Sequence, residues 1–85
     1  MISKKLSFVV DTKGNDIMAP QFVPSHSSVL RQYQVLAERS GDDEPMFARF
    51  PEDYVLVTVD FSSDGDVCVV GDISSTRFTD FIGKE

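Results

Sequence analysis

The chain has 85 residues, of which 41% are hydrophobic and 26% are charged. This length fits one small domain with a modest core. Fourteen acidic residues against eight basic ones give a net charge of −6, which excludes a uniformly basic binder of nucleic acid or anionic membrane. A single Cys excludes an intramolecular disulfide, and no stretch approaches the roughly 20 apolar residues that span a bilayer. We expect a domain that relies on a partner in a reducing compartment.

The N-terminal part of the sequence predicts a β-hairpin. Residues Leu6–Val10 are rich in β-forming side chains, and residues 11–16 contain a Gly and an Asn that suit a tight connection. The second strand should be short, over residues 16–18, because two prolines follow that lack a backbone N–H. Residues 19–24 are therefore expected to form an extended path or a sheet edge.

The next segment carries the clearest helical pattern in the chain. Ser and His residues at 25–28 offer good N-cap groups, and apolar residues then recur at helical spacing. We predict a helix over residues 27–39 that ends near Gly41, a residue suited to a left-handed C-cap. Its apolar face consists of Val29, Leu30, Tyr33, Leu36 and Ala37.

The second half of the sequence predicts another hairpin. Residues 46–50 are expected to form a short turn that packs one or both of its Phe rings beneath the helix. Residues Tyr54–Phe61 give the strongest strand pattern, which indicates a central position in the sheet. A turn at 62–65 should return the chain as an antiparallel strand at 66–70.

Together these elements predict an α+β fold: an antiparallel sheet of two β-hairpins, with one amphipathic helix over about residues 27–39 packed on one face. We assign residues 1–71 to a single domain and residues 72–85 to a C-terminal tail, a docking helix or a swapped arm. The spacing of the apolar residues in this segment fits one helical face. One sheet face is exposed unless the tail or a second copy covers it, so we expect a homodimer.

Charge is unevenly distributed along the chain. Residues 1–41 hold five basic and three acidic residues, a net of +2, whereas residues 42–85 hold three basic and eleven acidic residues, a net of −8. Halves of opposite sign favour a basic end that touches phosphate and an acidic end that meets a basic partner, although solvated faces without a partner explain the same pattern. The candidate nucleic-acid contacts are Lys4, Lys5, Lys13, Arg31 and Arg39. The candidate protein contacts are Asp42, Asp43, Glu44, Phe78, Phe81 and Ile82.

Catalytic chemistry finds little support in the sequence. His26 is the only His and lies beside a predicted helix N-terminus, where a capping-region surface role is expected. Cys68 is the only Cys and lies in a strand where a small apolar core side chain would serve. Residues 60–67 resemble the start of a calcium loop, but Gly71 stands where that loop needs a bidentate Glu. We therefore expect no enzyme, no metal site and no cofactor.

One motif resembles a known family. The run Phe50-Pro51-Glu52-Asp53-Tyr54-Val55-Leu56, which enters the second predicted strand pair, resembles the small nonstructural protein of gokushoviruses, which are single-stranded DNA phages of the Microviridae. Residues Ala19–Phe22 resemble its apolar Pro-Phe segment, and residues Leu30–Tyr33 resemble its aliphatic-Arg-x-aromatic helix. The resemblance covers about residues 6–65. It implies a non-capsid protein of the infected host bacterial cytoplasm with a role in viral DNA replication, single-strand synthesis or packaging.

Three hypotheses follow. The first is a nonenzymatic phage accessory protein that contacts single-stranded DNA through the basic N-terminal half. The alternative is an acidic adaptor that binds a viral replication protein, a capsid protein or a host protein. A third is an oligomer-forming module whose C-terminal apolar residues dock on a neighbour. No membrane contact is expected from any of them.

Overall fold

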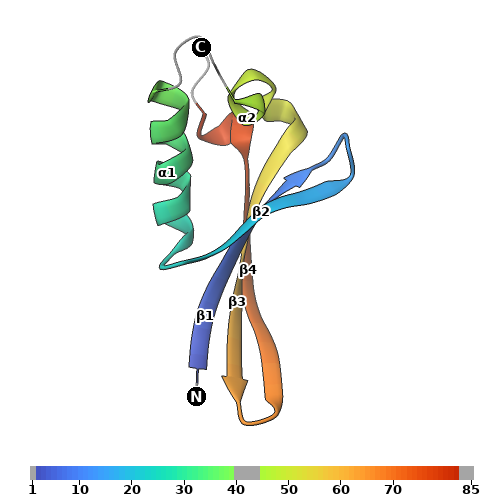
Figure 1. The fold of residues 1–85 in the computed structure, drawn as a ribbon, viewed down its shortest axis with the longest axis vertical. Coiled ribbons are helices and arrows are strands. Elements are labelled where there is room, and N and C mark those ends of the chain that lie inside the picture. Colours follow the sequence, from blue (N-terminus) through green and yellow to red (C-terminus); the bar gives the residue numbers. More distant parts are fainter. Residues whose placement is uncertain (1, 40–44, 83–85) are drawn as a thin grey trace.

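The computed structural model describes residues 2–39 and 45–82. Within these residues the chain forms a four-stranded antiparallel sheet in the order β2-β1-β3-β4, with one long helix, one short helix and two 3-10 turns (Figure 1). This is the α+β arrangement of two hairpins that the sequence predicts. The elements in chain order are β1 (Ile2–Asp11), β2 (Asp16–Val23), α1 (His26–Arg39), α2 (Met46–Arg49), η1 (Pro51–Asp53), β3 (Tyr54–Asp64), β4 (Val67–Arg77) and η2 (Phe78–Asp80).

The first hairpin has a longer second strand than the sequence predicts. The Asp11 carboxylate accepts the N–H groups of Lys13 and Gly14 at 3.1 and 2.9 Å, which fixes the turn. β2 then continues to Val23 across an irregularity opposite Ser7–Val9, where Ala19 adopts a positive φ of 55°. Because β2 is an edge strand, its proline leaves no ladder hydrogen bond unmade. Residues 19–23 therefore form a sheet edge.

Helix α1 begins at His26, one residue before the predicted start. The Ser25 side-chain oxygen accepts the backbone N–H of Ser28 at 3.1 Å, which is the N-cap interaction that the Ser-rich segment favours. Val29 and Tyr33 are buried, whereas Leu36 is 47% exposed. The buried stripe follows the i, i+4 row, so the apolar face is narrower than the sequence predicts. The predicted C-cap Gly41 lies outside the described residues.

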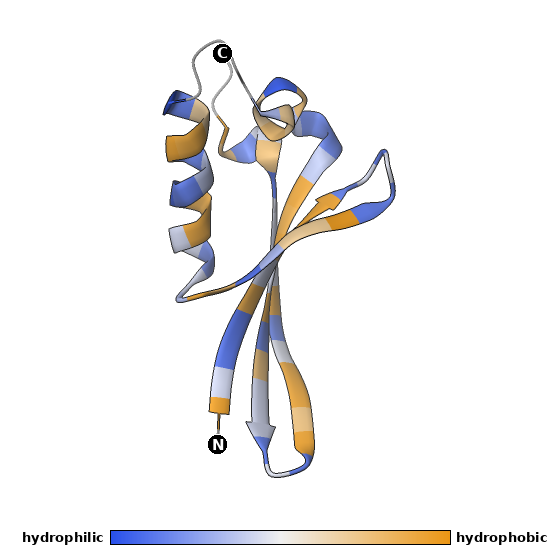
Figure 2. Ribbon diagram, in the orientation of Figure 1, coloured by the Kyte–Doolittle hydropathy of each residue, from blue (hydrophilic) through white to orange (hydrophobic). Residues whose placement is uncertain are grey.

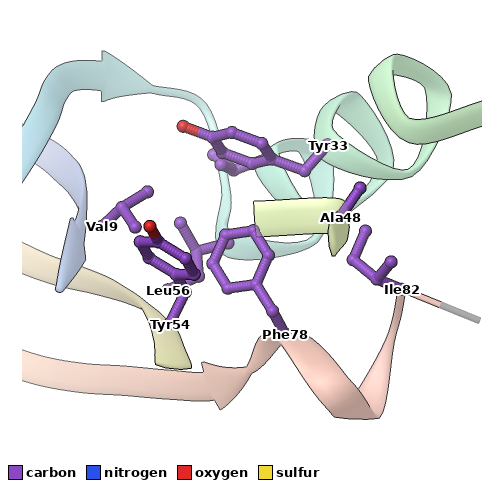
Figure 3. Packing of buried hydrophobic residues seen from close by; sticks show 8 residues of the cluster. Val9, Tyr33, Ala48, Tyr54, Leu56, Phe78 and Ile82 are labelled. Carbon is purple, nitrogen blue, oxygen red and sulfur yellow. The ribbon is translucent and has the colours of Figure 1, made fainter. Parts of the chain in front are cut away.

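The hydrophobic core lies between α1 and one face of the sheet, and α2 and η2 close its end (Figure 3). Phe78 is fully buried at its centre, where its ring centroid lies 5.4 Å from Tyr33 and from Phe47. Phe47 therefore packs beneath the helix as predicted, but Phe50 is 39% exposed. The buried cluster consists of Val9, Val29, Tyr33, Ala48, Tyr54, Leu56, Phe78 and Ile82.

The C-terminal segment corrects our assignment of residues 72–85 to a tail, docking helix or swapped arm. β4 continues to Arg77, which pairs with Val55. The Ser-rich sequence of this segment has low β propensity, but hydrogen bonding to the central strand β3 keeps it extended. The single turn η2 then places Phe78 and Ile82 in the core of the same chain. These two residues are not a docking surface for a neighbour, and Phe81 packs partly buried against them. Residues 83–85 lie outside the described part of the chain.

The molecule is elongated, with principal extents of 48 × 24 × 19 Å. Its length arises because the N-terminal half of β1 and the tip of the β3–β4 hairpin extend past the start of α1 (Figure 1). In Figure 2 this protruding end includes hydrophobic segments, notably in β4. Val67 and Val69 there are 61% and 51% exposed, so the core covers only part of the sheet.

Ser7 gives a first testable prediction about the core. Its side chain is 1% exposed, and its hydroxyl has no hydrogen-bond partner among the described residues. An unpaired buried hydroxyl costs about 1–3 kcal/mol of desolvation. We expect Ser7→Ala to raise the free energy of unfolding by about 1 kcal/mol in urea titrations. Thr58→Val is the matched variant on the paired strand, and it should lower stability because Thr58 contacts His26. A destabilised Ser7→Ala protein would refute this explanation.

Candidate interaction surface

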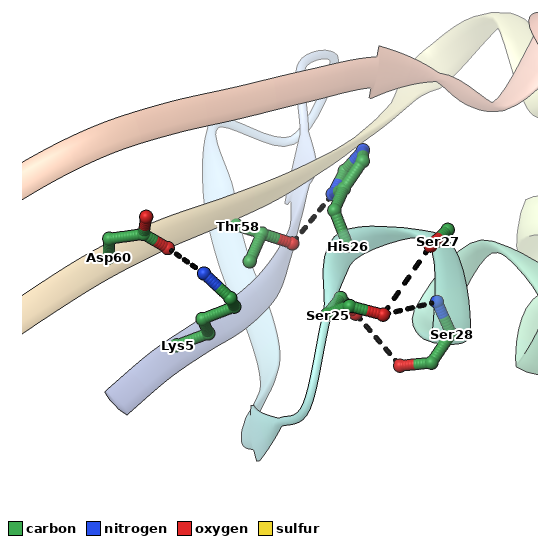
Figure 4. A network of polar contacts seen from close by, with 7 residues as sticks. All are labelled: Lys5, Ser25, His26, Ser27, Ser28, Thr58 and Asp60. Carbon is green, nitrogen blue, oxygen red and sulfur yellow. Dashed lines mark hydrogen bonds and ion pairs between the residues drawn. The ribbon is translucent and has the colours of Figure 1, made fainter. Parts of the chain in front are cut away.

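The five candidate nucleic-acid contacts do not share one face. Lys4 is exposed on β1, while its neighbour Lys5 points to the opposite side of the sheet. The Lys5 ammonium forms an ion pair with the Asp60 carboxylate at 2.8 Å, so part of its charge is compensated locally (Figure 4). Lys13 lies in the turn beyond the far end of β1, roughly 23 Å of extended strand away from Lys4. The two remaining basic residues, Arg31 and Arg39, are exposed on α1.

The predicted acidic contacts Asp42, Asp43 and Glu44 lie outside the described residues.

The His26 side chain connects α1 to the sheet and is not a free surface residue. Its Nδ1 lies 2.7 Å from the Thr58 hydroxyl on β3, and its Nε2 lies 2.9 Å from the Thr76 hydroxyl on β4. The first residue of α1 is thereby joined to two strands, and Figure 4 shows the contact with Thr58. Burial lowers the pKa of His26 below its ordinary value.

The lowered pKa of His26 predicts a pH dependence of stability. Because the folded protein holds the imidazole neutral more strongly than the unfolded chain does, the unfolded chain binds more protons in this range. The contribution is fully present above about pH 6.5 and is lost as the pH falls through the folded pKa. The urea concentration at the unfolding midpoint should therefore decrease as the pH is lowered from about 7 to about 5. The same step should be absent in His26→Gln, and a step of equal size in that variant would assign it to another group.

Cys68 lies on β4 opposite Ser63 and is exposed, which corrects the prediction of a small core side chain. It lies on the part of the β3–β4 hairpin that extends past α1, where it does not contribute to the buried core. Among residues 2–39 and 45–82 there is no cluster of three or more His, Cys, Asp or Glu that would hold a metal ion. No helix in the same ranges is long and apolar enough to cross a bilayer.

The most distinctive surface is the sheet face opposite α1. Strand register places apolar residues side by side in rows across it: Leu6 lies between Phe22 and Val59, and Val10 lies between Ile17 and Val55. We call this surface the open face. Its apolar members, all placed by register, are Ile2, Leu6, Phe8, Val10, Ile17, Phe22, Val55, Val57, Val59, Phe61, Cys68, Val70 and Ile73.

Exposure on the open face is highest toward its two edges. Phe22 and Ile17 on β2 are 67% and 63% exposed, and Ile73 on β4 is 65% exposed. On the central strands, Ile2 at the start of β1 is 63% exposed, Val59 is buried, and the other apolar residues of the face are half-buried. Two basic residues, Lys4 and Arg77, also belong to this face, because they pair with Phe61 and Val55.

A hollow of about 230 Å³ lies on the open face at the end that extends past α1. Lys4, Phe22 and Phe61 line it together with Cys68, so it joins β1, β2, β3 and β4. Its lining is apolar, so Lys4 contributes the methylene groups of its side chain together with the aromatic rings. It is the place where a candidate basic residue meets aromatic side chains.

A second hollow of about 250 Å³ lies on the helix side, and its lining includes Met18, Tyr33, Phe47 and Tyr54. Burial, then the negative charges of Asp11 and Asp53, raise the pKa of Tyr54 above its ordinary value. The phenol is held neutral, and the hollow is apolar in character. It extends the core and brings together no pair of catalytic groups.

Sequence reasoning identified the alternation of β3 but did not include the open face among the candidate sites. The signal was present, because Val55, Val57, Val59 and Phe61 alternate and occupy one face. What the sequence lacked was the lateral order of the strands. That order brings Phe22 and Ile73 into the same row from positions far apart in the chain.

Comparison with known proteins gives one match. Residues 4–65 match the family model described as Phage ORF5 protein, and no curated protein and no solved structure matches the chain. The matched segment includes α1, β2, β3 and nearly all of β1. It supports the prediction of a phage protein, while the narrower resemblance to gokushoviruses stays a prediction. Since the match covers 62 of the 85 residues, the chain belongs to the Phage ORF5 protein family.

Proposed function

We propose that this protein is a nonenzymatic phage accessory protein that serves viral DNA replication, single-strand synthesis or packaging as a binding module, in the host bacterial cytoplasm. The observation that carries the proposal is the open face. Soluble monomers rarely expose contiguous apolar patches larger than a few hundred Å², and larger patches mark interaction sites. Here thirteen apolar side chains share one sheet face; six of them are exposed, six are half-buried, and Val59 is buried.

The chemistry of the open face favours a protein partner over single-stranded DNA. Most of its side chains are aliphatic, and aliphatic groups gain from burial against other apolar groups rather than from contact with phosphate. The basic residues that a DNA contact would need are divided between the two sheet faces, a turn and α1. The adaptor alternative therefore has more support than the DNA hypothesis, with the open face replacing the acidic loop as the contact surface.

The hollow around Lys4 supports single-stranded DNA as a second candidate. Bases stack on aromatic rings while a nearby ammonium contacts phosphate. Phe22 and Phe61 line the hollow with the methylene groups of Lys4, whose side chain ends in an ammonium group. In this case an oligonucleotide should bind at low salt, and Lys4→Ala should weaken binding and flatten its salt dependence. Arg31→Ala combined with Arg39→Ala is the matched control on α1. Equal loss in both variants would assign binding to general charge rather than to this hollow.

The binding-module proposal is tested in infected cells. Phage carrying Ile17→Ser and Phe22→Ser should yield less single-stranded genome and fewer virions, by more than about tenfold, because truncating an apolar anchor of an interface costs about 2 kcal/mol or more. Both side chains are more than 60% exposed, so the fold should persist, and thermal unfolding of the purified variant checks this.

The control for this experiment is Leu36→Ser, which changes an exposed apolar residue on α1, away from the open face. Its phage should grow normally. Wild-type yields from the open-face double variant, with the variant protein folded and present at normal levels, would refute the proposal.

A further inference from the structure

We propose that a second copy of this chain covers the open face, so that the working protein is a homodimer of two sheets packed face to face with α1 on each outer side. The inference rests on the proposed function, because it assigns a partner to the same surface. It is carried by the amount of surface left uncovered, by the shape of the chain and by the arrangement of residues within the face.

The accessible surface of the single chain exceeds that of a typical monomer of the same mass by about the area that one partner buries in an interface. Its accessible surface is 5913 Å² for a mass of 9.5 kDa. Folded monomers of that mass expose about 5,050 Å². The excess of somewhat over 800 Å² matches the roughly 800 Å² that each partner buries in a standard specific interface.

The shape of the chain also indicates sheet surface that its own helices leave uncovered. The Cα radius of gyration is 14.2 Å, whereas a compact domain of this length has a value of about 12 Å. The extra length comes from sheet that no helix covers at the end beyond α1 (Figure 1). Two such sheets packed about 10 Å apart would form a sandwich with a second apolar layer between them.

The open face is self-complementary about a two-fold axis that runs along the strands between β1 and β3. Rotation about this axis keeps the position of each row along the strands and reverses the lateral order of the strands. β2 of one copy therefore faces β4 of the other, and β1 faces β3. Phe22 then meets the partner's Ile73, and Leu6 meets the partner's Val59, because the four belong to one row.

The charged residues of the face fit the same arrangement. Lys4 meets the ring of the partner's Phe61, which is a favourable cation–π contact. Lys4 and Arg77 stay apart, because their rows on β3, at Phe61 and Val55, are separated by roughly 20 Å of strand. No like charges are brought together across the two-fold axis, as an isologous interface requires.

The test is the molar mass in solution, measured by sedimentation equilibrium on the full chain. The wild type should have twice the monomer mass of 9.5 kDa. Phe22→Asp combined with Ile73→Asp places carboxylates on two exposed residues that face each other across the two-fold axis, and their repulsion should halve that mass. Leu36→Asp, on α1, should leave it doubled. Circular dichroism verifies that all three proteins are folded.

Each other outcome overturns the inference. A monomeric wild type would do so directly. A folded Phe22→Asp, Ile73→Asp variant that stays dimeric would place the contact elsewhere, for example at the outer edge of β4. A monomeric wild type that binds an oligonucleotide, or whose Ile17→Ser, Phe22→Ser phage is defective, would leave the open face as a binding site with a different occupant. A monomeric wild type whose double-variant phage grows normally would refute both proposals.

Discussion

Phe78→Ala should destabilise this protein more than any other single truncation of the core. The side chain is fully buried, and four aromatic rings surround it, the closest being that of Phe81 at a centroid distance of 4.8 Å. Replacing a buried Phe by Ala costs about 3–5 kcal/mol through lost transfer energy and a residual cavity. A domain of this length has a total stability of about 4–13 kcal/mol, so this single change should remove a large fraction of it.

Urea titration followed by circular dichroism measures this effect. Phe50→Ala is the matched control, because Phe50 is 39% exposed and its truncation should cost less than about 1 kcal/mol. If Phe78→Ala does not fold, Phe78→Leu should show a smaller, measurable loss. Equal effects at positions 78 and 50 would contradict the placement of Phe78 at the centre of the core.

Truncation after Gly71 should abolish the fold. The deletion removes the half of β4 that pairs with Val55–Val59 of the central strand, together with the two core residues Phe78 and Ile82. If residues 72–85 were instead a separable tail or a swapped arm, the remaining residues would keep a folded core. The proton NMR spectrum should therefore lose its dispersion, and cooperative thermal unfolding should disappear.

The control for the truncation is a chain that ends after Ile82, which retains every residue of the buried cluster. It should give a dispersed spectrum and a cooperative transition. A well-dispersed spectrum from the chain that ends at Gly71 would restore the separable-tail interpretation.

The elements that the sequence predicted well are those in which local pattern and tertiary packing agree. Helix α1 combines an N-cap Ser with apolar residues at helical spacing, and β3 is an almost continuous run of β-forming residues. Even the sheet edge at 19–23 was among the predicted alternatives, because Pro20 is tolerated on an edge strand. In these segments the differences are in the boundaries: α1 begins one residue earlier than predicted, and β3 continues three residues beyond the predicted Phe61, to Asp64.

The end of the chain was predicted poorly because its structure depends on partners distant in sequence. The second half of β4 contains Gly, Asp and Ser residues with low β propensity, and register with β3 determines its conformation. The apolar spacing of Phe78, Phe81 and Ile82 fits a helical face, yet one 3-10 turn suffices to place two of these residues in the core. Spacing alone does not distinguish a docking face from a core face.

The candidate site in the structure differs from the one predicted from the sequence for a related reason. Net charge by halves grouped Lys4, Lys5 and Lys13 by sequence, whereas strand alternation places Lys4 and Lys5 on opposite faces. The open face arises from rows that cross four strands, and composition carries no information about rows. The expectation that one sheet face lacks a cover follows from two hairpins and a single helix, and the structure identifies the residues on that face.

The reactivity of Cys68 tests the central claim most directly, because this exposed thiol is the only one in the chain and lies in the hollow of the open face. Its reaction rate with a water-soluble disulfide reagent should fall as protein concentration rises and the open face becomes covered. In the folded Phe22→Asp, Ile73→Asp variant the rate should stay high at every concentration. A rate that is high and independent of concentration in the wild type would contradict coverage of this face by a second copy.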